Sequence, residues 1–154
     1  MSLLEDLNGS IEEEKELESK EDKSVSNTKR KTLDIYADWL DTSKDNVFEK
    51  FDENGIYITA DLIEEFCIDI KPYEDHNNFE RSGIFISAMI NSAYRNGDNQ
   101  FVVRTQHLEK GLYWIGFQID GTKDNRINLT IDGKSKGDSG SQSRYCDITF
   151  NGDT

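Results

Sequence analysis

Residues 128–133 read Asn-Leu-Thr-Ile-Asp-Gly and residues 147–152 read Asp-Ile-Thr-Phe-Asn-Gly, so one pattern recurs after 19 residues. In each copy apolar residues alternate with polar ones, which is typical of a strand with one buried face. Each copy ends in a glycine, which readily forms a tight turn. The repeat therefore predicts two equivalent strands, each closed by a turn.

Two arrangements of these strands fit the repeat. In a parallel stack, Leu129 would lie beside Ile148 and Ile131 beside Phe150, whereas an antiparallel hairpin would set Leu129 nearer Phe150. The intervening residues 134–146 number 13, and hairpin loops usually take about 2–5 residues. We therefore favour the parallel stack, with the hairpin as the alternative.

Three spaced glycines, Gly133, Gly137 and Gly140, are followed by the run of residues 146–152, which contains the second copy of the repeat. This arrangement resembles the glycine-repeat β-helix known as the GXGXG domain, found in the C-terminal part of glutamate synthase and in one of the subunits of formylmethanofuran dehydrogenase. The resemblance covers only about the last 30 residues, and Cys146 stands where the family has a glycine. It implies a right-handed β-helix that serves as a scaffold, with the glycines at its corners and no catalytic residues in its repeats.

Upstream of the repeat, apolar residues first recur at helical intervals and then alternate. Thr59 is placed to cap the second of the expected helices, and the third has the widest apolar stripe, so we expect it in the core. The predicted helices cover residues 33–40, 62–70 and 85–94, and the predicted strands cover residues 100–105 and 111–119.

These patterns predict an α+β fold in three segments. A small domain of helices and strands at residues 32–126 would lead into the start of a right-handed β-helix (β-solenoid) at residues 127–154. Residues 1–31 are dense in Glu, Lys and Ser, with no aromatic and few β-branched residues. We expect this segment to be a disordered acidic tail.

The formal net charge of -13 disfavours nucleic acids and anionic membranes as partners. The chain start has no secretory signal, and no segment has transmembrane length. We therefore expect a cytoplasmic protein whose partner is another protein, and the acidic charge suits a basic one.

No residues have the spacing of a catalytic or metal site. His76 and His107 lie 31 positions apart, which fits neither short zinc-binding pattern. Cys67 lies on an apolar helix face, where a thiol is inert. We expect a protein that is not an enzyme and that carries no cofactor and no metal.

The leading hypothesis is therefore a non-catalytic scaffold or protein-interaction protein. Tyr113, Trp114 and Phe117 lie close together in one predicted strand, with Tyr113 and Phe117 on one face and Trp114 on the other. Aromatic residues are favoured in binding sites, so one face is a candidate interaction surface, with core packing as the alternative use. The runner-up function is a small-ligand or calcium-binding module that uses the acidic C-terminal turns, at Asp120, Asp124, Asp132 and Asp138.

Overall fold

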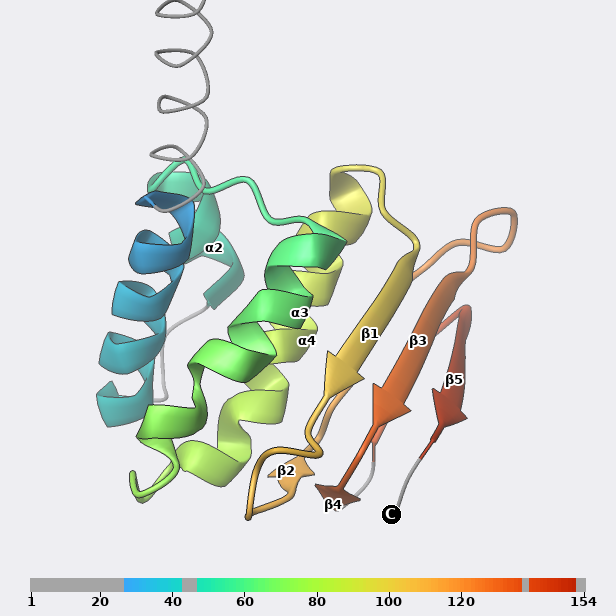
Figure 1. Cartoon of the computed structure of the whole chain (residues 1–154). Coiled ribbons are helices and arrows are strands. Elements are labelled where there is room, and N and C mark those ends of the chain that lie inside the picture. Colours follow the sequence, from blue (N-terminus) through green and yellow to red (C-terminus); the bar gives the residue numbers. More distant parts are fainter. Residues whose placement is uncertain (1–26, 43–46, 137–138, 152–154) are drawn as a thin grey trace, which may run out of the picture.

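In the computed structural model, which describes residues 27–42, 47–136 and 139–151, helices come first along the chain and strands follow. Figure 1 shows the helices grouped on one side of the molecule and the strands on the other. A helix over residues 27–42 precedes α2 (Val47–Glu53), α3 (Ala60–Asp69), the 3-10 helices η1 (Lys71–Tyr73) and η2 (Phe79–Arg81), and α4 (Ser82–Arg95). The strands are β1 (Gln100–Arg104), β2 (Leu112–Tyr113), β3 (Ile127–Asp132), β4 (Ser135–Lys136) and β5 (Cys146–Phe150).

Helix α3 forms where the apolar spacing predicts it, and Thr59 is its N-cap. The Thr59 hydroxyl accepts a hydrogen bond from the Leu62 backbone N–H at 3.2 Å, which satisfies one of the free donors of the first turn. The apolar stripe of the helix, which includes Phe66, is buried. The helix ends at Asp69, and Pro72, which has no backbone N–H to donate to the Ile68 carbonyl, lies in the 3-10 helix η1 that follows.

The expectation that the third predicted helix lies in the core is confirmed for α4, in which Phe85 and Met89 are fully buried. The ring of Phe85 lies 5.1 Å from that of Tyr36 and 5.3 Å from that of Phe66, measured between centroids. The buried Tyr36 hydroxyl is hydrogen-bonded to the Ser82 hydroxyl at 2.6 Å. Burial raises the pKa of Tyr36 well above its usual range.

The strands pair in parallel throughout the described residues. The larger sheet has the order β1-β3-β5, and the smaller sheet pairs β2 with β4. In the larger sheet Leu129 is in register with Ile148, and Ile131 with Phe150. This register confirms the predicted parallel arrangement of the repeat, and the hairpin alternative is wrong.

The expected fold class needs a correction, because the structure is an α+β domain with two small parallel sheets and does not show the start of a right-handed β-helix. A β-helix would enclose a core made by its own repeats. Here the inward side chains of Phe101 and Leu129 belong to one hydrophobic cluster with Phe66 and Met89 of the helices. Helices and sheet therefore share one core, as in an ordinary layered domain.

This shared core contains residues from both sides of the domain boundary that we expected between residues 126 and 127. Strands β1 and β3, which lie on either side of that position, pair along their length. Residues 27–31, expected to belong to the disordered tail, form the start of the first helix, where Lys29 Nζ lies 3.0 Å from Glu65 of α3. Residues 1–26 of the expected tail lie outside the described residues.

The strand expected at residues 111–119 is shorter than predicted, because β2 ends at Tyr113. Trp114 and Gln118 adopt left-handed φ angles of 60° and 56°, which a strand cannot contain. The segment instead turns against α4, where the Ser87 hydroxyl accepts hydrogen bonds from the backbone N–H groups of Gly116 and Phe117. A contact with a distant helix overrides the local strand preference here.

Candidate functional site

The two edges of the larger sheet differ in how they are covered. Helix α3 lies beside β1, whereas β5 forms the opposite edge and, among the described residues, pairs only with β3 (Figure 1). An uncovered edge strand presents unpaired backbone groups that can bind another strand. The β5 edge, defined here as Tyr145 to Asn151, is therefore a candidate binding surface.

Backbone hydrogen bonds to β3 at the two ends of β5 show which backbone groups of β5 point away from β3. The Asn151 N–H donates to the Ile131 carbonyl at 2.9 Å, and the Tyr145 carbonyl accepts from the Ile127 N–H at 3.0 Å. Because backbone groups point to alternate sides along a strand, the N–H and C=O groups of Ile148 and Phe150 point away from β3. Within the described residues no other strand pairs with these groups, which leaves them available to a further strand.

The side chains of the β5 edge are unusually apolar for an exposed position. Phe150 is 44% exposed and Tyr145 is 45% exposed, and Ile148 is half-buried. Strand β5 also contains neither proline nor lysine, the residues that commonly protect a sheet edge. The edge thus combines free backbone groups with apolar contact area, as strand-accepting surfaces do.

Two side-chain contacts hold β5 against the rest of the domain. The Arg126 guanidinium makes two hydrogen bonds to the Asp147 carboxylate, at 2.9 and 3.0 Å. This ion pair lowers the pKa of Asp147 and raises that of Arg126.

Ile148 packs over Gly140, where a Cβ would come within 2.4 Å of the Ile148 side chain. Gly140 also has a left-handed φ of 78°, as does Gly133 with 126°, and Gly137 lies outside the described residues.

The predicted interaction surface is only partly assembled. The rings of Tyr113 and Trp114 lie together, with centroids 5.8 Å apart, whereas alternation along a strand would have separated them. Lys136 Nζ of β4 lies 5.9 Å from the centre of the Tyr113 ring. Phe117 is half-buried and follows in the turn. Tyr113 and Trp114 thus form a small half-buried aromatic pair, and whether they bind a partner stays a prediction.

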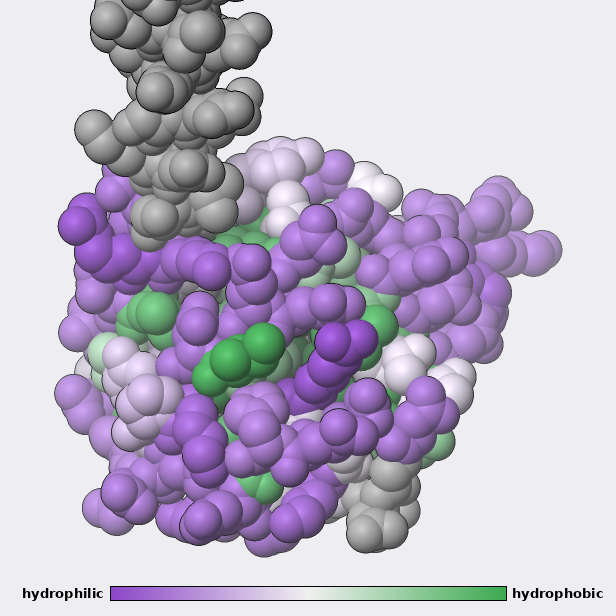
Figure 2. All heavy atoms as spheres, in the orientation of Figure 1, coloured by the Kyte–Doolittle hydropathy of each residue, from purple (hydrophilic) through white to green (hydrophobic). Residues whose placement is uncertain are grey.

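A second surface feature is an open groove at the carboxyl ends of α3 and β1. Its volume is about 680 Å³, and it is lined by Ile68, Asp69, Lys71, Pro72, Arg104, Gln106 and His107. Ile68 is 59% exposed although it is apolar. Figure 2 shows hydrophobic atoms gathered over α3 within a largely hydrophilic face.

The histidines and cysteines make structural contacts. His107 Nε2 donates a hydrogen bond to the Cys67 carbonyl at 2.7 Å, and His76 lies 2.9 Å from Asp41. Burial raises the pKa of the Cys67 thiol to about 12, so it carries no thiolate at neutral pH. Half-burial raises the pKa of Cys146 to about 11. Neither thiol is an activated nucleophile, and the expectation that the protein is not an enzyme stays a prediction.

The acidic C-terminal turns do not converge in the described part of the chain. Asp120 pairs with Arg144 at 2.9 Å, and Asp132 accepts a hydrogen bond from the Gln106 amide at 2.7 Å. Asp124 is exposed in its turn, and Asp138 lies outside the described residues. Within residues 27–42, 47–136 and 139–151, no three acidic, histidine or cysteine side chains are grouped as metal ligands would be.

Sequence reasoning missed both the β5 edge and the groove. The sequence did indicate that Ile68 is unusual. It is an apolar residue on the polar face of α3, whereas the buried residues of that helix lie on its other face. For Arg104 there was no such indication, since a single arginine at a strand end is ordinary. The open edge depends on which strands pair, which a local pattern does not specify.

None of the helices formed by the described residues is both long enough and apolar enough to cross a membrane. The chain matches no family model, no curated protein and no solved structure. The resemblance to the glycine-repeat domain therefore stays a prediction.

Proposed function

We propose that this protein is a non-catalytic interaction protein, and that its β5 edge accepts an extended segment of a protein partner. One observation carries the proposal: the β5 edge is uncovered by the described residues and exposes Phe150 and Tyr145, while α3 covers the other edge of the same sheet. Strand addition at such an edge gains affinity from main-chain hydrogen bonds and specificity from alternate side chains.

The chemistry of the surface suggests what kind of segment binds. The inward row of β5, which includes Ile148 and Phe150, would contact apolar residues at every second position of the partner strand. The net charge of -13 favours a partner segment with basic residues at the remaining positions. The partner is thus an extended segment that alternates apolar and basic residues.

The location and the runner-up function depend on the thiols and on the acidic turns. Free thiols at Cys67 and Cys146 suit the reducing cytoplasm, where we infer the protein acts. A calcium-binding or small-ligand module would need converging acidic groups, and the partners of Asp120 and Asp132 are already Arg144 and Gln106. Strand acceptance is therefore the function we favour.

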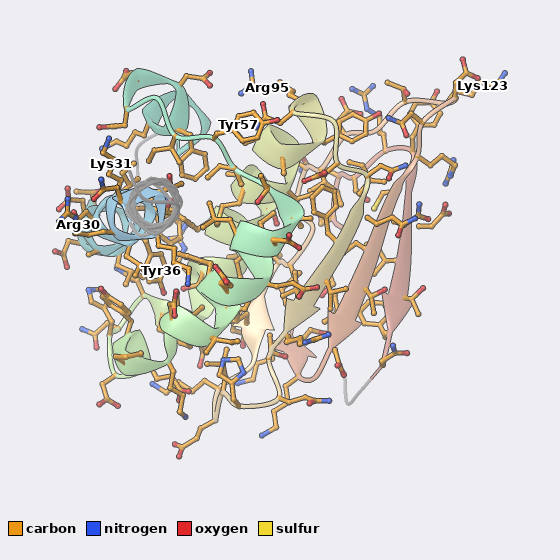
Figure 3. The ribbon with its side chains drawn as sticks, turned by 45° about the horizontal axis from the view of Figure 1, so that its top comes forward. Arg30, Lys31, Tyr36, Tyr57, Arg95 and Lys123 are labelled. Atoms are coloured by element: carbon orange, nitrogen blue, oxygen red, sulfur yellow. The ribbon has the colours of Figure 1, made fainter. Side chains whose placement is uncertain are left out.

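A labelled peptide that alternates valine and lysine tests the proposal by fluorescence anisotropy. We expect wild-type protein to bind it and Phe150→Lys to bind about tenfold more weakly or worse, because the change removes apolar contact and protects the edge. Tyr57→Lys is the matched control. It makes the same charge change at a large side chain that is 61% exposed, beside Arg95 on the helical side of the molecule (Figure 3).

A second peptide separates strand addition from charge attraction. Replacing its central valine by proline removes a backbone donor and keeps the charge. Equal binding of both peptides, or equal weakening by Phe150→Lys and Tyr57→Lys, would contradict strand addition at β5.

A further inference from the structure

We propose that the groove at the carboxyl ends of α3 and β1 is a second binding site, which takes the free carboxylate end of a peptide together with the apolar side chain of its last residue. The site shares no residue with the β5 edge and does not depend on strand addition there. Its ligand class follows from which groups in the groove already have partners.

The two walls of the groove are held rigidly against each other. His107, from the turn after β1, donates to the Cys67 carbonyl of α3 at 2.7 Å. On the other side of the turn, the Thr105 hydroxyl donates to the Lys134 carbonyl at 2.6 Å, and the Thr105 N–H to the Asp132 carbonyl at 2.9 Å. A preformed groove loses little conformational entropy when a ligand enters, which favours binding.

A buried carboxylate engages Lys71, one of the residues that line the groove. Glu74 is only 7% exposed, and its Oε1 lies 2.9 Å from Lys71 Nζ. The same carboxylate accepts the Glu109 backbone N–H at 3.2 and 3.3 Å. Burial works against the charged form of Glu74, but the bonds from Lys71 and Glu109 prevail and lower its pKa. The Lys71 charge is therefore engaged within the protein.

Arg104 is the cation of the groove that is left for a ligand. Gln106 is bonded to Asp132 at 2.7 Å, as His107 is to Cys67. Within the described residues, the Arg104 guanidinium has no hydrogen bond and no ion pair, although it lines the groove. A guanidinium fits a carboxylate with two parallel hydrogen bonds, which gives both affinity and orientation.

The apolar part of the groove supplies the second half of the recognition. Ile68, 59% exposed, and Pro72 line the groove on the helix side, and Arg104 lines it from the end of β1. A ligand with one carboxylate beside one apolar side chain would meet both features at once. The groove is open, so it suits a chain end that lies across it more than an enclosed small molecule.

The remaining charges limit how acidic the ligand can be. Asp69 is the one carboxylate among the lining residues, and it acts together with Glu65 to raise the pKa of Lys29. The net charge of -13 would repel a run of acidic residues. A single chain-terminal carboxylate meets the guanidinium with the least repulsion.

The test uses a labelled pentapeptide that ends in leucine, prepared both with a free carboxylate and as its amide. Fluorescence anisotropy with the full chain should show binding of the acid, with the amide weaker by about tenfold or more, as expected for loss of a charged hydrogen-bonding partner. Arg104→Gln should weaken binding of the acid to the same extent, and Ile68→Ser should weaken both peptides. Added salt should weaken the binding of the acid more steeply than the binding of the amide.

Arg144→Gln is the matched control, because it removes an exposed arginine that already pairs with Asp120. Melting temperatures of all variants show whether a loss of binding reflects a loss of fold. Equal affinity for the acid and the amide, or undiminished binding by Arg104→Gln, overturns the proposal, as does absence of binding to the wild type. Because Phe150 is untouched in these variants, strand addition at β5 can be scored separately.

Discussion

Ser87 is a small polar side chain that α4 buries against the turn after β2. Its hydroxyl donates to the Gly83 carbonyl at 2.6 Å and accepts the N–H groups of Gly116 at 2.7 Å and Phe117 at 3.0 Å. One oxygen atom thereby fixes the backbone that carries Trp114. At the scale of single residues, such buried polar atoms set the geometry of the surface around them.

Ser87→Ala should leave two backbone N–H groups without this acceptor. We expect the free energy of unfolding to fall by about 1–3 kcal/mol, the usual cost of an unsatisfied buried group. Urea unfolding measures the change, with Ser143→Ala as control because Ser143 only donates to a nearby carbonyl in a half-exposed turn. An equal and small effect of both changes would show that water replaces the Ser87 hydroxyl.

The Cys67 thiol should make stability depend on pH in the alkaline range. Burial raises its pKa from an ordinary 9.0 to about 12, so the unfolded chain loses this proton at lower pH than the folded chain does. The contribution of the protonated Cys67 thiol to the free energy of unfolding is complete below about pH 9 and declines as pH rises toward about 12.

Cys67→Ala should therefore show a shallower decline of unfolding free energy over that pH range than the wild type. Urea unfolding at a series of alkaline pH values measures both slopes. Cys146→Ala, which changes a half-buried thiol, should alter the slope less. Identical slopes for wild type and Cys67→Ala would mean that Cys67 is more open to solvent than its burial indicates.

At the scale of secondary-structure elements, α4 and β2 touch backbone to backbone. A Cβ built on Gly83 would lie 2.0 Å from the Tyr113 carbonyl oxygen and 2.9 Å from the Ile115 nitrogen. Both neighbours are backbone atoms, which cannot rotate away. The close approach lets the first turn of α4 support β2, whose last residue, Tyr113, belongs to the aromatic pair.

Gly83→Ala should reverse the usual effect of that change in a helix. Alanine ordinarily stabilises a helix interior by about 1 kcal/mol relative to glycine, but here the added methyl group must push α4 and β2 apart. We expect a lower melting temperature and a shift in the near-ultraviolet circular dichroism of Tyr113 and Trp114. A higher melting temperature would show that the two elements separate without cost.

At the scale of the whole molecule, the acidic N-terminal segment should divide into two parts with different effects. Residues 1–26 hold little apolar surface to offset the entropy of ordering, so their removal should leave the melting temperature nearly unchanged. Removal of residues 1–31 should lower it by several degrees, because Lys29 pairs with Glu65 and the Thr28 carbonyl accepts from buried Thr32. Equal melting temperatures of the two truncated chains would show that the first turns of the helix contribute nothing.

The local patterns of the chain were sufficient to predict several elements. Apolar residues at helical spacing predicted α3 and α4, including Thr59 as a cap, because capping and amphipathic burial depend on neighbours within a few residues. The recurrence after 19 residues predicted the parallel register of Leu129 with Ile148, since equivalent side chains stack when a repeat pairs with itself. These features are local or periodic, and so a single sequence contains them.

Tertiary structure alone decided the features on which the proposals depend. The turn at Trp114 replaces a predicted strand because Ser87, 27 positions away, binds its backbone. The sheet shares its core with the helices, where the sequence had predicted the start of a β-helix. Helix α3 lies beside β1, and the described part of the chain leaves the β5 edge uncovered. The groove joins Ile68 to Arg104 only because α3 lies along β1. Each of these depends on contacts between distant segments, whose free energy no local pattern records.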